Sequence, residues 1–352
     1  MDIQQMMQLV VAQDASDLHL VVGKPPTIRV HGSLLHIPQQ SELTPEEAET
    51  LIYSILSPEQ KEMYLVNKEI DFSYQFGEAG RFRVNVYAQQ GTIGAAFRLI
   101  PTRIKTIEEL GLPDILHEFA RWKQGLVLVT GPTGHGKSST LAAVINEINH
   151  QREEHILTIE DPIEFVYPPA KSIISQRELH ADTHSWDIAL RSALREDPDI
   201  VLVGEMRDYE TIASAITVAE TGHLVFATLH TNSAAQTVDR IIDVFPASQQ
   251  DQVRSQLALA LQAIISQRLI PSLQGPRVVA TEILFANTAI RNLIREAKTY
   301  QIDSVLQTST EIGMMTIEMS LANLVQGGKL DIDTARKYAL RPDDLDKLVA
   351  RY

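Results

Sequence analysis

The chain has 352 residues, of which 44% are hydrophobic, and a formal net charge of −14 at neutral pH. This length predicts about two domains with a substantial buried core. The acidic balance argues against a dedicated nucleic-acid binder, because such proteins cluster basic residues, and the absence of cysteine excludes disulfides and thiolate metal sites.

The sequence carries no targeting or membrane-spanning signal. Its first residues lack the basic and then apolar pattern of a signal peptide, and no apolar run approaches the ~20 residues needed to cross a bilayer. We therefore expect a cytoplasmic protein with no direct membrane span, which reaches a membrane only through partners or surface contacts.

Residues 1–100 predict a small α+β domain. Apolar residues at helical spacing, beginning with Ile3 and ending with Val10, predict an N-terminal helix, and further helices are expected from about Pro45 and Pro58. Strands are expected at 17–22, 27–31, 70–76, 81–89 and 92–100, each bounded by Gly, Pro or other turn residues. The alternating pattern then stops, which predicts a linker over residues 101–117.

Residues 118–287 alternate apolar strands with helical stretches. Strands are expected at 126–129, 155–159, 200–203, 223–228 and 278–283. This alternation predicts an α/β domain with a mostly parallel sheet covered by helices. Residues 288–352 are predicted to form a helical C-terminal region.

A glycine-rich segment follows the first of these strands and fits the phosphate-loop pattern G-x-x-x-x-G-K-[ST]. Its glycines let backbone N–H groups curl around phosphates, Lys137 reaches the β- and γ-phosphates, and the Ser138 hydroxyl can coordinate Mg²⁺. A helix expected from Ser139 directs its N-terminus at the anion. The predicted nucleotide-binding residues are Gly131, Pro132, Thr133, Gly134, His135, Gly136, Lys137, Ser138 and Ser139. His135 is the unusual member, since a small residue would crowd the phosphates less.

Hydrolysis needs further groups that position water and neutralise charge. The strand at 200–203 ends in Gly204 and Glu205, an arrangement typical of a Walker B element, so Glu205 is the candidate for orienting or deprotonating the attacking water. Many such strands carry Asp before the Glu, whereas this chain has Gly204.

Two later segments add polar groups at strand ends. Glu160, Asp161 and Glu164 cluster around a proline, which is costly unless a cation or ordered water uses them; Glu160 and Asp161 are the metal candidates beside Ser138, and Glu164 is a catalytic candidate. The buried strand at 223–228 has a histidine at each end, with His223 at its start and His230 after it. His230 lies at the end where ligands gather in open α/β sheets and is the candidate sensor of the γ-phosphate, whereas His223 is expected to be structural.

These motifs occur in the order found in the secretion-superfamily ATPases, which the chain resembles along essentially its whole length. The tract Ala-Ile-Arg-Asn-Leu-Ile-Arg-Glu at 289–296 is similar to the C-terminal signature of the PilT-type pilus retraction ATPases. The resemblance implies a PAS-like N-terminal domain, a RecA-like P-loop ATPase domain, ATP and Mg²⁺ as cofactors, and a homohexameric ring. It also implies the inner-membrane platform protein of the type IV pilus machine as partner. The family pattern places a small residue where this chain has His135.

The resemblance gives a role to arginines on the N-terminal strands. Arg81 and Arg83 alternate with apolar residues along one strand, and Arg98 is similarly placed on the next. By pattern alone this is an ordinary solvated sheet face. With the resemblance, Arg81, Arg83 and Arg98 become candidate arginine fingers that reach a nucleotide at a domain or subunit interface.

The tract at 289–296 would by spacing alone be an amphipathic surface helix. The resemblance makes it a candidate for coupling hydrolysis to pilus retraction.

Other interpretations of the whole protein stay open: a pilus assembly or type II secretion ATPase, a nucleotide-binding accessory subunit with little turnover, and a nucleic-acid translocase, which the acidic composition disfavours.

Overall fold

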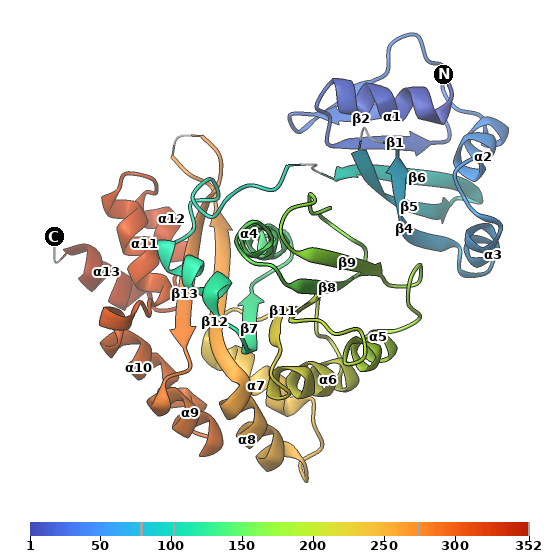
Figure 1. Cartoon of the computed structure of the whole chain (residues 1–352). Coiled ribbons are helices and arrows are strands. Elements are labelled where there is room, and N and C mark those ends of the chain that lie inside the picture. The colour runs from blue at the N-terminus through green and yellow to red at the C-terminus, as the bar shows by residue number, and fades with distance from the viewer. Residues whose placement is uncertain (78–79, 101–102, 274, 351–352) are drawn as a thin grey trace. The chain divides into compact units, whose positions relative to one another are not determined.

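The computed structural model describes residues 1–77, 80–100, 103–273 and 275–350 (Figure 1). The chain divides into two compact units. The first comprises Met1–Arg103 with Pro162–Val166, and the second comprises Ile104–Asp161 with Tyr167–Tyr352.

The first unit is an antiparallel sheet of six strands with three helices, in the order β3-β2-β1-β6-β5-β4. The strands are β1 (Asp17–Val21), β2 (Thr27–Val30), β3 (Ser33–His36), β4 (Glu69–Phe76), β5 (Gly80–Gln89) and β6 (Thr92–Ile100). The helices are α1 (Ile3–Ala12), α2 (Pro45–Tyr53) and α3 (Pro58–Asn67). The helices and five of these strands lie where the sequence predicts them. Strand β3 was not predicted, because all four of its residues are exposed and carry no buried alternation.

Local sequence explains why these elements begin and face as they do. Thr44 and Ser57 each cap a helix through a capping box, with proline at the first helical position. Along β5, Phe82 and Val84 are fully buried while Arg81 and Arg83 are only half-buried. The predicted separation of an apolar and an arginine-bearing face is thus confirmed.

The second unit is built on a seven-stranded sheet in the order β13-β12-β7-β11-β10-β8-β9, in which only the β12–β13 pair is antiparallel. The strands are β7 (Gly125–Thr130), β8 (His155–Glu160), β9 (Ile173–Glu178), β10 (Ile200–Val203), β11 (Leu224–Leu229), β12 (Leu261–Ile270) and β13 (Val278–Phe285). The helices between them are α4 (Lys137–Gln151), α5 (Trp186–Ala193), α6 (Tyr209–Glu220), α7 (Ala234–Asp243) and α8 (Gln250–Ala260). Helix α4 covers one face, and α6, α7 and α8 cover the other (Figure 1). The predicted α/β architecture with a mostly parallel sheet is confirmed.

Two strands of this sheet, β12 and β9, were not predicted from the sequence. Strand β12 follows α8 directly at Leu261, with no turn residue between them, so periodicity did not mark the change from helix to strand. Strand β9 lies at the sheet edge and is mostly half-buried, so it lacks a continuous apolar run. The first omission matters, because β12 lies beside β7 and the phosphate loop.

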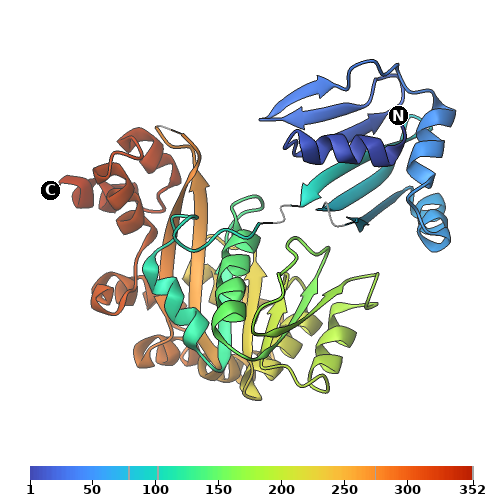
Figure 2. The same ribbon diagram turned by 45° about the horizontal axis from the view of Figure 1, so that its top comes forward.

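The chain after β13 is helical, as predicted. It contains α9 (Thr288–Arg295), η2 (Thr299–Gln301), α10 (Ile302–Thr308), η3 (Thr310–Ile312), α11 (Ile317–Gln326), α12 (Ile332–Tyr338) and α13 (Pro342–Ala350). Leu321 of α11 and Leu345 of α13 share one buried cluster with Ile270 and Ala280 of the last two strands. These helices therefore pack on the β12–β13 side of the sheet (Figure 2).

The described part of the segment expected to link the two domains consists of turns and irregular backbone up to Pro113, followed by one short helical element. Residues 101–102 lie outside the described ranges, and the second unit begins at Ile104. A 3₁₀ helix, η1 (Asp114–Arg121), lies alongside α4 and buries Leu116 and Phe119 completely (Figure 2). Among the described residues, no helix combines the length and apolar character needed to cross a bilayer.

Candidate nucleotide site

The phosphate-loop pattern lies between the end of β7 and the start of α4, as expected. Gly131, Gly134 and Gly136 all have positive φ, at 142°, 76° and 85°. A Cβ on Gly131 would lie 2.4 Å from the carbonyl oxygen of Gln267, so the loop passes too close to β12 for a side chain at this position. Backbone conformation and close approach both require glycine here.

Gln267 of β12 holds the loop in place, and the sequence analysis missed it. Its side chain is only 2% exposed, its Nε2 donates to the carbonyl of His135 at 2.6 Å, and its Oε1 accepts from the Thr140 hydroxyl at 2.8 Å. One amide thus joins the loop to the first turns of α4. No motif marks a lone glutamine, and only the pairing of β12 with β7 brings it to the loop.

The ring of His135 is directed at β12. Its Nδ1 accepts the backbone N–H of Leu269 at 3.0 Å. Burial, together with the positive charges of Arg277, Lys137 and Arg268, lowers the pKa of His135. The imidazole therefore acts as a neutral acceptor for the Leu269 N–H. This N–H needs such a partner because β12 continues past the end of β7. Whether this side chain crowds the phosphates stays a prediction.

Lys137, Ser138 and Ser139 form the first turn of α4. The Lys137 side chain is buried, and its ammonium donates to the carbonyls of Gly131 and Pro132 at 2.9 and 3.2 Å. Both serines are half-buried. The cation, the hydroxyls and the N-terminus of α4 are therefore gathered around one loop, the arrangement that binds polyphosphate.

Glu205 follows β10, and His230 lies between its carboxylate and the phosphate loop. Its Oε2 lies 3.3 Å from Nε2 of His230, and its Oε1 pairs with Nε of Arg207 at 2.5 Å. The Nδ1 atom of His230 lies 3.5 Å from Nζ of Lys137 and 3.4 Å from Oγ1 of Thr133. The structure thus brings together the predicted base, the predicted sensor and the phosphate loop. Arg207, with a side chain 73% exposed, was not predicted.

The backbone around Glu205 is fixed by both neighbouring strands. Gly204 N–H donates to Ile159 of β8 at 2.8 Å, and Met206 N–H donates to Thr228 of β11 at 3.0 Å. A Cβ on Gly204 would meet the Ile159 carbonyl oxygen at 3.2 Å and the ring of Trp186 at 3.3 Å. An aspartate before Glu205 would therefore require these neighbours to shift by a few tenths of an ångström.

The two histidines that flank β11 have different surroundings. His223 precedes the strand, and its Nδ1 lies 3.1 Å from the Val218 carbonyl and from the Thr221 hydroxyl at the end of α6. This agrees with the structural role expected for it. Only His230 contacts the predicted site.

The acidic residues do not form a metal cluster by themselves. Glu160 is buried at the end of β8, where its Oε1 accepts from the Thr158 hydroxyl and from Nε2 of Gln176 at 2.7 and 3.2 Å. Asp161 follows and is exposed. Glu164 lies in the segment that belongs to the first unit, so its catalytic role stays a prediction. In the described part of the chain, no group of three His, Asp or Glu side chains is arranged to hold a metal ion.

The three candidate arginine fingers, Arg81, Arg83 and Arg98, have partners within their own sheet. Nε of Arg98 lies 2.9 Å from Oδ1 of Asp17, and Arg83 pairs with Asp71 through Nε and Nη2 at 3.0 and 2.5 Å. Nη2 of Arg81 donates to the Ser73 hydroxyl. Arg83 and Arg98 are directly opposite each other across the β5–β6 pair. The structure gathers these cations on one sheet face, while their action on a nucleotide stays a prediction.

A pocket of about 550 Å³ adjoins His230 on the side of α7. Arg207, His230, Gln236, Asp239 and Arg240 are among the residues that line it. Three of these come from α7. The helix that follows His230 therefore also lines the space beside this histidine.

The tract at 289–296 coincides with α9, which begins one residue earlier at Thr288 and ends at Arg295. Ile290 and Ile294 are fully buried, and Leu293 is half-buried. Nη1 of Arg291 donates to the Ala258 and Leu259 carbonyls at the end of α8, at 2.5 and 2.7 Å. The predicted amphipathic helix is present, and Arg291 caps its neighbour.

Comparison with known proteins identifies the family. Residues 1–319 match the model of the Type II/IV secretion system protein family. The chain is 50% identical to the type IV pilus retraction ATPase PilT of Pseudomonas aeruginosa over 98% of this chain and 100% of that protein, and 52% identical to a twitching motility protein of Neisseria gonorrhoeae over 91% and 86%. A crystal structure of the pilus retraction motor PilT with bound ADP superposes with a TM-score of 0.92, at 46% identity and 99% coverage of both chains. The chain therefore belongs to the Type II/IV secretion system protein family and, within it, to the PilT-type pilus retraction ATPases that serve twitching motility.

Proposed function

We propose that this ATPase hydrolyses Mg-ATP at the phosphate loop with Glu205 as the base and His230 as the sensor of the γ-phosphate. The observation that carries the proposal is the contact series from Lys137 through His230 to Glu205, at 3.5 and 3.3 Å. Glu205 orients a water molecule and takes its proton as the oxygen attacks the γ-phosphorus. The bond to the bridging oxygen then breaks, and ADP and phosphate leave.

Magnesium fits this arrangement as an ion with few protein ligands. Mg²⁺ keeps several waters and binds through one or two protein oxygens together with substrate phosphates. Ser138 would hold it directly, and Glu160 and Asp161 would act on its waters, because Glu160 already accepts two hydrogen bonds from neighbouring side chains. When bound, the ion neutralises charge on the β- and γ-phosphates. Glu164 is proposed to act in catalysis beside this acidic group.

Arg81, Arg83 and Arg98 are proposed to act as arginine fingers in a homohexameric ring. Their support is the shared sheet face and, for Arg98, a side chain that is 71% exposed although its Nε is paired with Asp17. An arginine finger contributes ~10³–10⁵ in rate. Turnover would then depend on assembly, since each finger reaches the nucleotide across a domain or subunit interface.

Within the cell, we propose that the ring lies in the cytoplasm at the inner membrane, held there by the platform protein of the type IV pilus machine. Hydrolysis would move the two units of each chain relative to each other and so draw pilin subunits from the pilus base.

The experiment that tests the proposed function compares ATP hydrolysis by the wild type and Glu205→Gln, with and without Mg²⁺, and records the oligomer mass of the same samples. We expect Mg-dependent turnover by a hexamer and a loss of at least 100-fold in the variant, with ADP affinity retained. Nucleotide binding without turnover by the wild type would instead favour an accessory subunit. Turnover that survives Glu205→Gln would remove the role of this residue.

A further inference from the structure

Glu282 of β13 is a buried carboxylate that the site described above does not use. Its side chain is fully buried, its Oε1 accepts the backbone N–H of Ala234 at 2.7 Å, and its Oε2 has no hydrogen-bond partner among the described residues. Burial raises the pKa of Glu282 to about 7, against the lowering effect of the Ala234 N–H. A buried, incompletely paired carboxylate is costly for folding, so what it contacts is informative.

The contact at Ala234 fixes the start of α7. Ala234 is the first residue of this helix, and its N–H is one of the groups that a helix leaves without an internal partner. A carboxylate at this position also interacts favourably with the positive end of the helix dipole. Glu282 therefore anchors α7 to β13 through a single, fully buried hydrogen bond.

The anchored helix in turn fixes the loop that carries His230. Thr231 is joined to Thr237 by hydroxyl groups 2.7 Å apart, and Asn232 N–H donates to Oε1 of Gln236 at 2.9 Å. The loop at 230–233 is thus tied to the first turn of α7. His230, which lies four residues before Ala234, contacts Glu205 and Lys137 from this loop.

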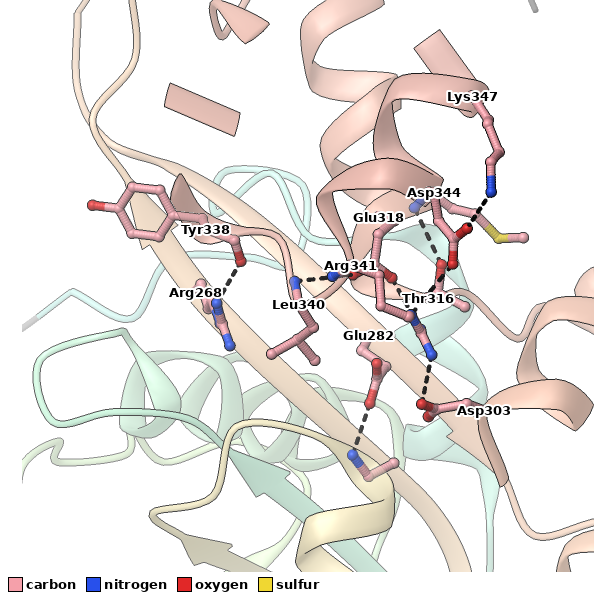
Figure 3. Close-up of polar contacts among 12 residues, drawn as sticks. Arg268, Glu282, Asp303, Thr316, Glu318, Tyr338, Leu340, Arg341, Asp344 and Lys347 are labelled. Carbon is pink, nitrogen blue, oxygen red and sulfur yellow. Dashed lines mark hydrogen bonds and ion pairs between the residues drawn. The ribbon is translucent and has the colours of Figure 1, made fainter. Parts of the chain in front are cut away.

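On its other side Glu282 faces the C-terminal helices (Figure 3). Arg341, just before α13, donates to Oδ2 of Asp303 on α10 at 2.5 Å and to Oε2 of Glu318 on α11 at 3.1 Å. Oε1 of Glu318 also accepts the backbone N–H groups of Leu340 and Arg341. The charges of Asp303 and Glu318 raise the pKa of Glu282 and that of Arg341 lowers it, so all three act electrostatically on the buried carboxylate.

Hydrogen bonds also join strand β13 to α11 and to the residues just before this helix. They lie on both sides of Glu282 in the sequence. The Thr281 N–H donates to the Ser320 hydroxyl at 3.0 Å, and Ile283 and Met315 exchange two backbone hydrogen bonds at 2.8 and 3.0 Å. A displacement of α11 therefore moves the backbone that carries Glu282. The C-terminal helices, Glu282, α7 and His230 form one continuous series of bonds.

We propose that Glu282 is a positioning residue for ATP hydrolysis, which sets the place of His230 through the Ala234 N–H and so couples the C-terminal helices to the nucleotide site. The inference rests on the proposed role of His230. Because α7 also carries Gln236, Asp239 and Arg240, the same anchor shapes the pocket beside His230.

The test measures kcat, KM and ADP affinity of the wild type, Glu282→Leu and Glu282→Gln in the full-length protein. Leucine removes the acceptor, whereas glutamine retains an acceptor oxygen. We expect Glu282→Leu to lower kcat at least tenfold while KM and ADP affinity stay within twofold, and Glu282→Gln to recover at least half of the wild-type kcat. An unchanged kcat in Glu282→Leu, a parallel loss of kcat and ADP affinity, or a glutamine variant no better than leucine would each overturn the proposal.

A second pair of variants keeps the inference testable if Glu282→Leu does not fold. Arg341→Gln loosens the C-terminal contacts, and its control is Arg336→Gln, an exposed arginine of α12 that also pairs with two carboxylates. We expect Arg341→Gln to lower kcat at least threefold at unchanged KM, whereas Arg336→Gln keeps the wild-type rate. Equal rates for both arginine variants would overturn the coupling.

The outcome also separates this inference from the proposed function. A wild type that does not hydrolyse ATP, or a His230→Ala variant with full kcat, refutes the proposed function. A wild type that hydrolyses ATP and loses kcat with His230→Ala, but not with Glu282→Leu, refutes only the role of Glu282.

Discussion

The side-chain amide of Gln267 donates to the backbone carbonyl of His135 at 2.6 Å, which ties the phosphate loop to the neighbouring strand β12. The same side chain accepts from Thr140 in α4. A residue outside every nucleotide-binding motif thus holds the phosphate loop against β12.

Replacing Gln267 by leucine should weaken nucleotide binding. Two buried hydrogen bonds worth about 1 kcal/mol each are lost, which corresponds to up to about 30-fold in affinity. Titration with a fluorescent ADP analogue measures the effect. Gln262→Leu is the matched control, because Gln262 lies on the same strand but its side chain makes only long hydrogen bonds, to Gln124 and Arg291 at 3.4 Å. Equal affinities for both variants would contradict the supporting role.

His135 should make the loop sensitive to acid. Its Nδ1 accepts from Leu269 only when unprotonated, and burial, together with nearby positive charges, lowers its pKa in the folded protein. A depressed folded pKa means that this contribution to stability is complete above the unfolded value, about 6.5 for histidine. It is then lost as the pH falls from there through the folded pKa.

The corresponding variant is His135→Gln, which keeps an acceptor oxygen but does not titrate. We expect the melting temperature of the wild type to fall more steeply than that of His135→Gln between pH 6.5 and pH 5. Thermal unfolding across this range provides the measurement. His150→Gln, at the exposed end of α4, should retain the wild-type slope. Parallel curves for the wild type and His135→Gln would rule out this histidine as the source.

Arg98→Ala should reduce turnover with little effect on folding. An arginine finger contributes ~10³–10⁵ in rate, so we expect kcat to fall at least 100-fold in the assembled protein. Its salt bridge to Asp17 is mostly exposed on the arginine side and adds little stability.

The control for Arg98→Ala is Arg29→Ala, because Nε of Arg29 lies 3.6 Å from Oδ2 of the same aspartate. Steady-state hydrolysis and oligomer mass are measured for both variants. A finger predicts loss of turnover for Arg98→Ala alone. Equal losses would assign the effect to the surroundings of Asp17.

Leu293→Ala should impair pilus retraction more than nucleotide binding. Leu293 of α9 is only half-buried, so its truncation leaves the core largely intact, whereas the fully buried Ile294 would cost about 2–5 kcal/mol when replaced by alanine. Twitching of complemented cells and ADP affinity of purified protein are the two measurements. Leu259→Ala, on the adjacent α8 and 64% exposed, is the control. Normal twitching in the Leu293→Ala strain would refute the coupling role of this helix.

Short sequence patterns predicted many of the helices and strands and the place of the phosphate loop. Pro45 and Pro58 marked two helix starts, alternation separated the faces of β5, and glycine spacing located the phosphate loop. These features depend on a few consecutive residues and on backbone geometry, so they can be read without the fold. The same holds for Glu205 and His230, which directly follow apolar strands.

Tertiary structure decided which distant residues support that site. Gln267 reaches the loop because β12 pairs with β7, although no local pattern marks β12 as a strand after α8. Glu282 of β13 bonds to Ala234 of α7, which lies 48 residues earlier in the chain. The direction of the His135 ring likewise depends on the backbone of Leu269. Such contacts join segments far apart in the chain, so no local pattern encodes them. The sequence alone determined the chemistry at the loop, and the packing of β12, β13 and the C-terminal helices determined what holds it in place.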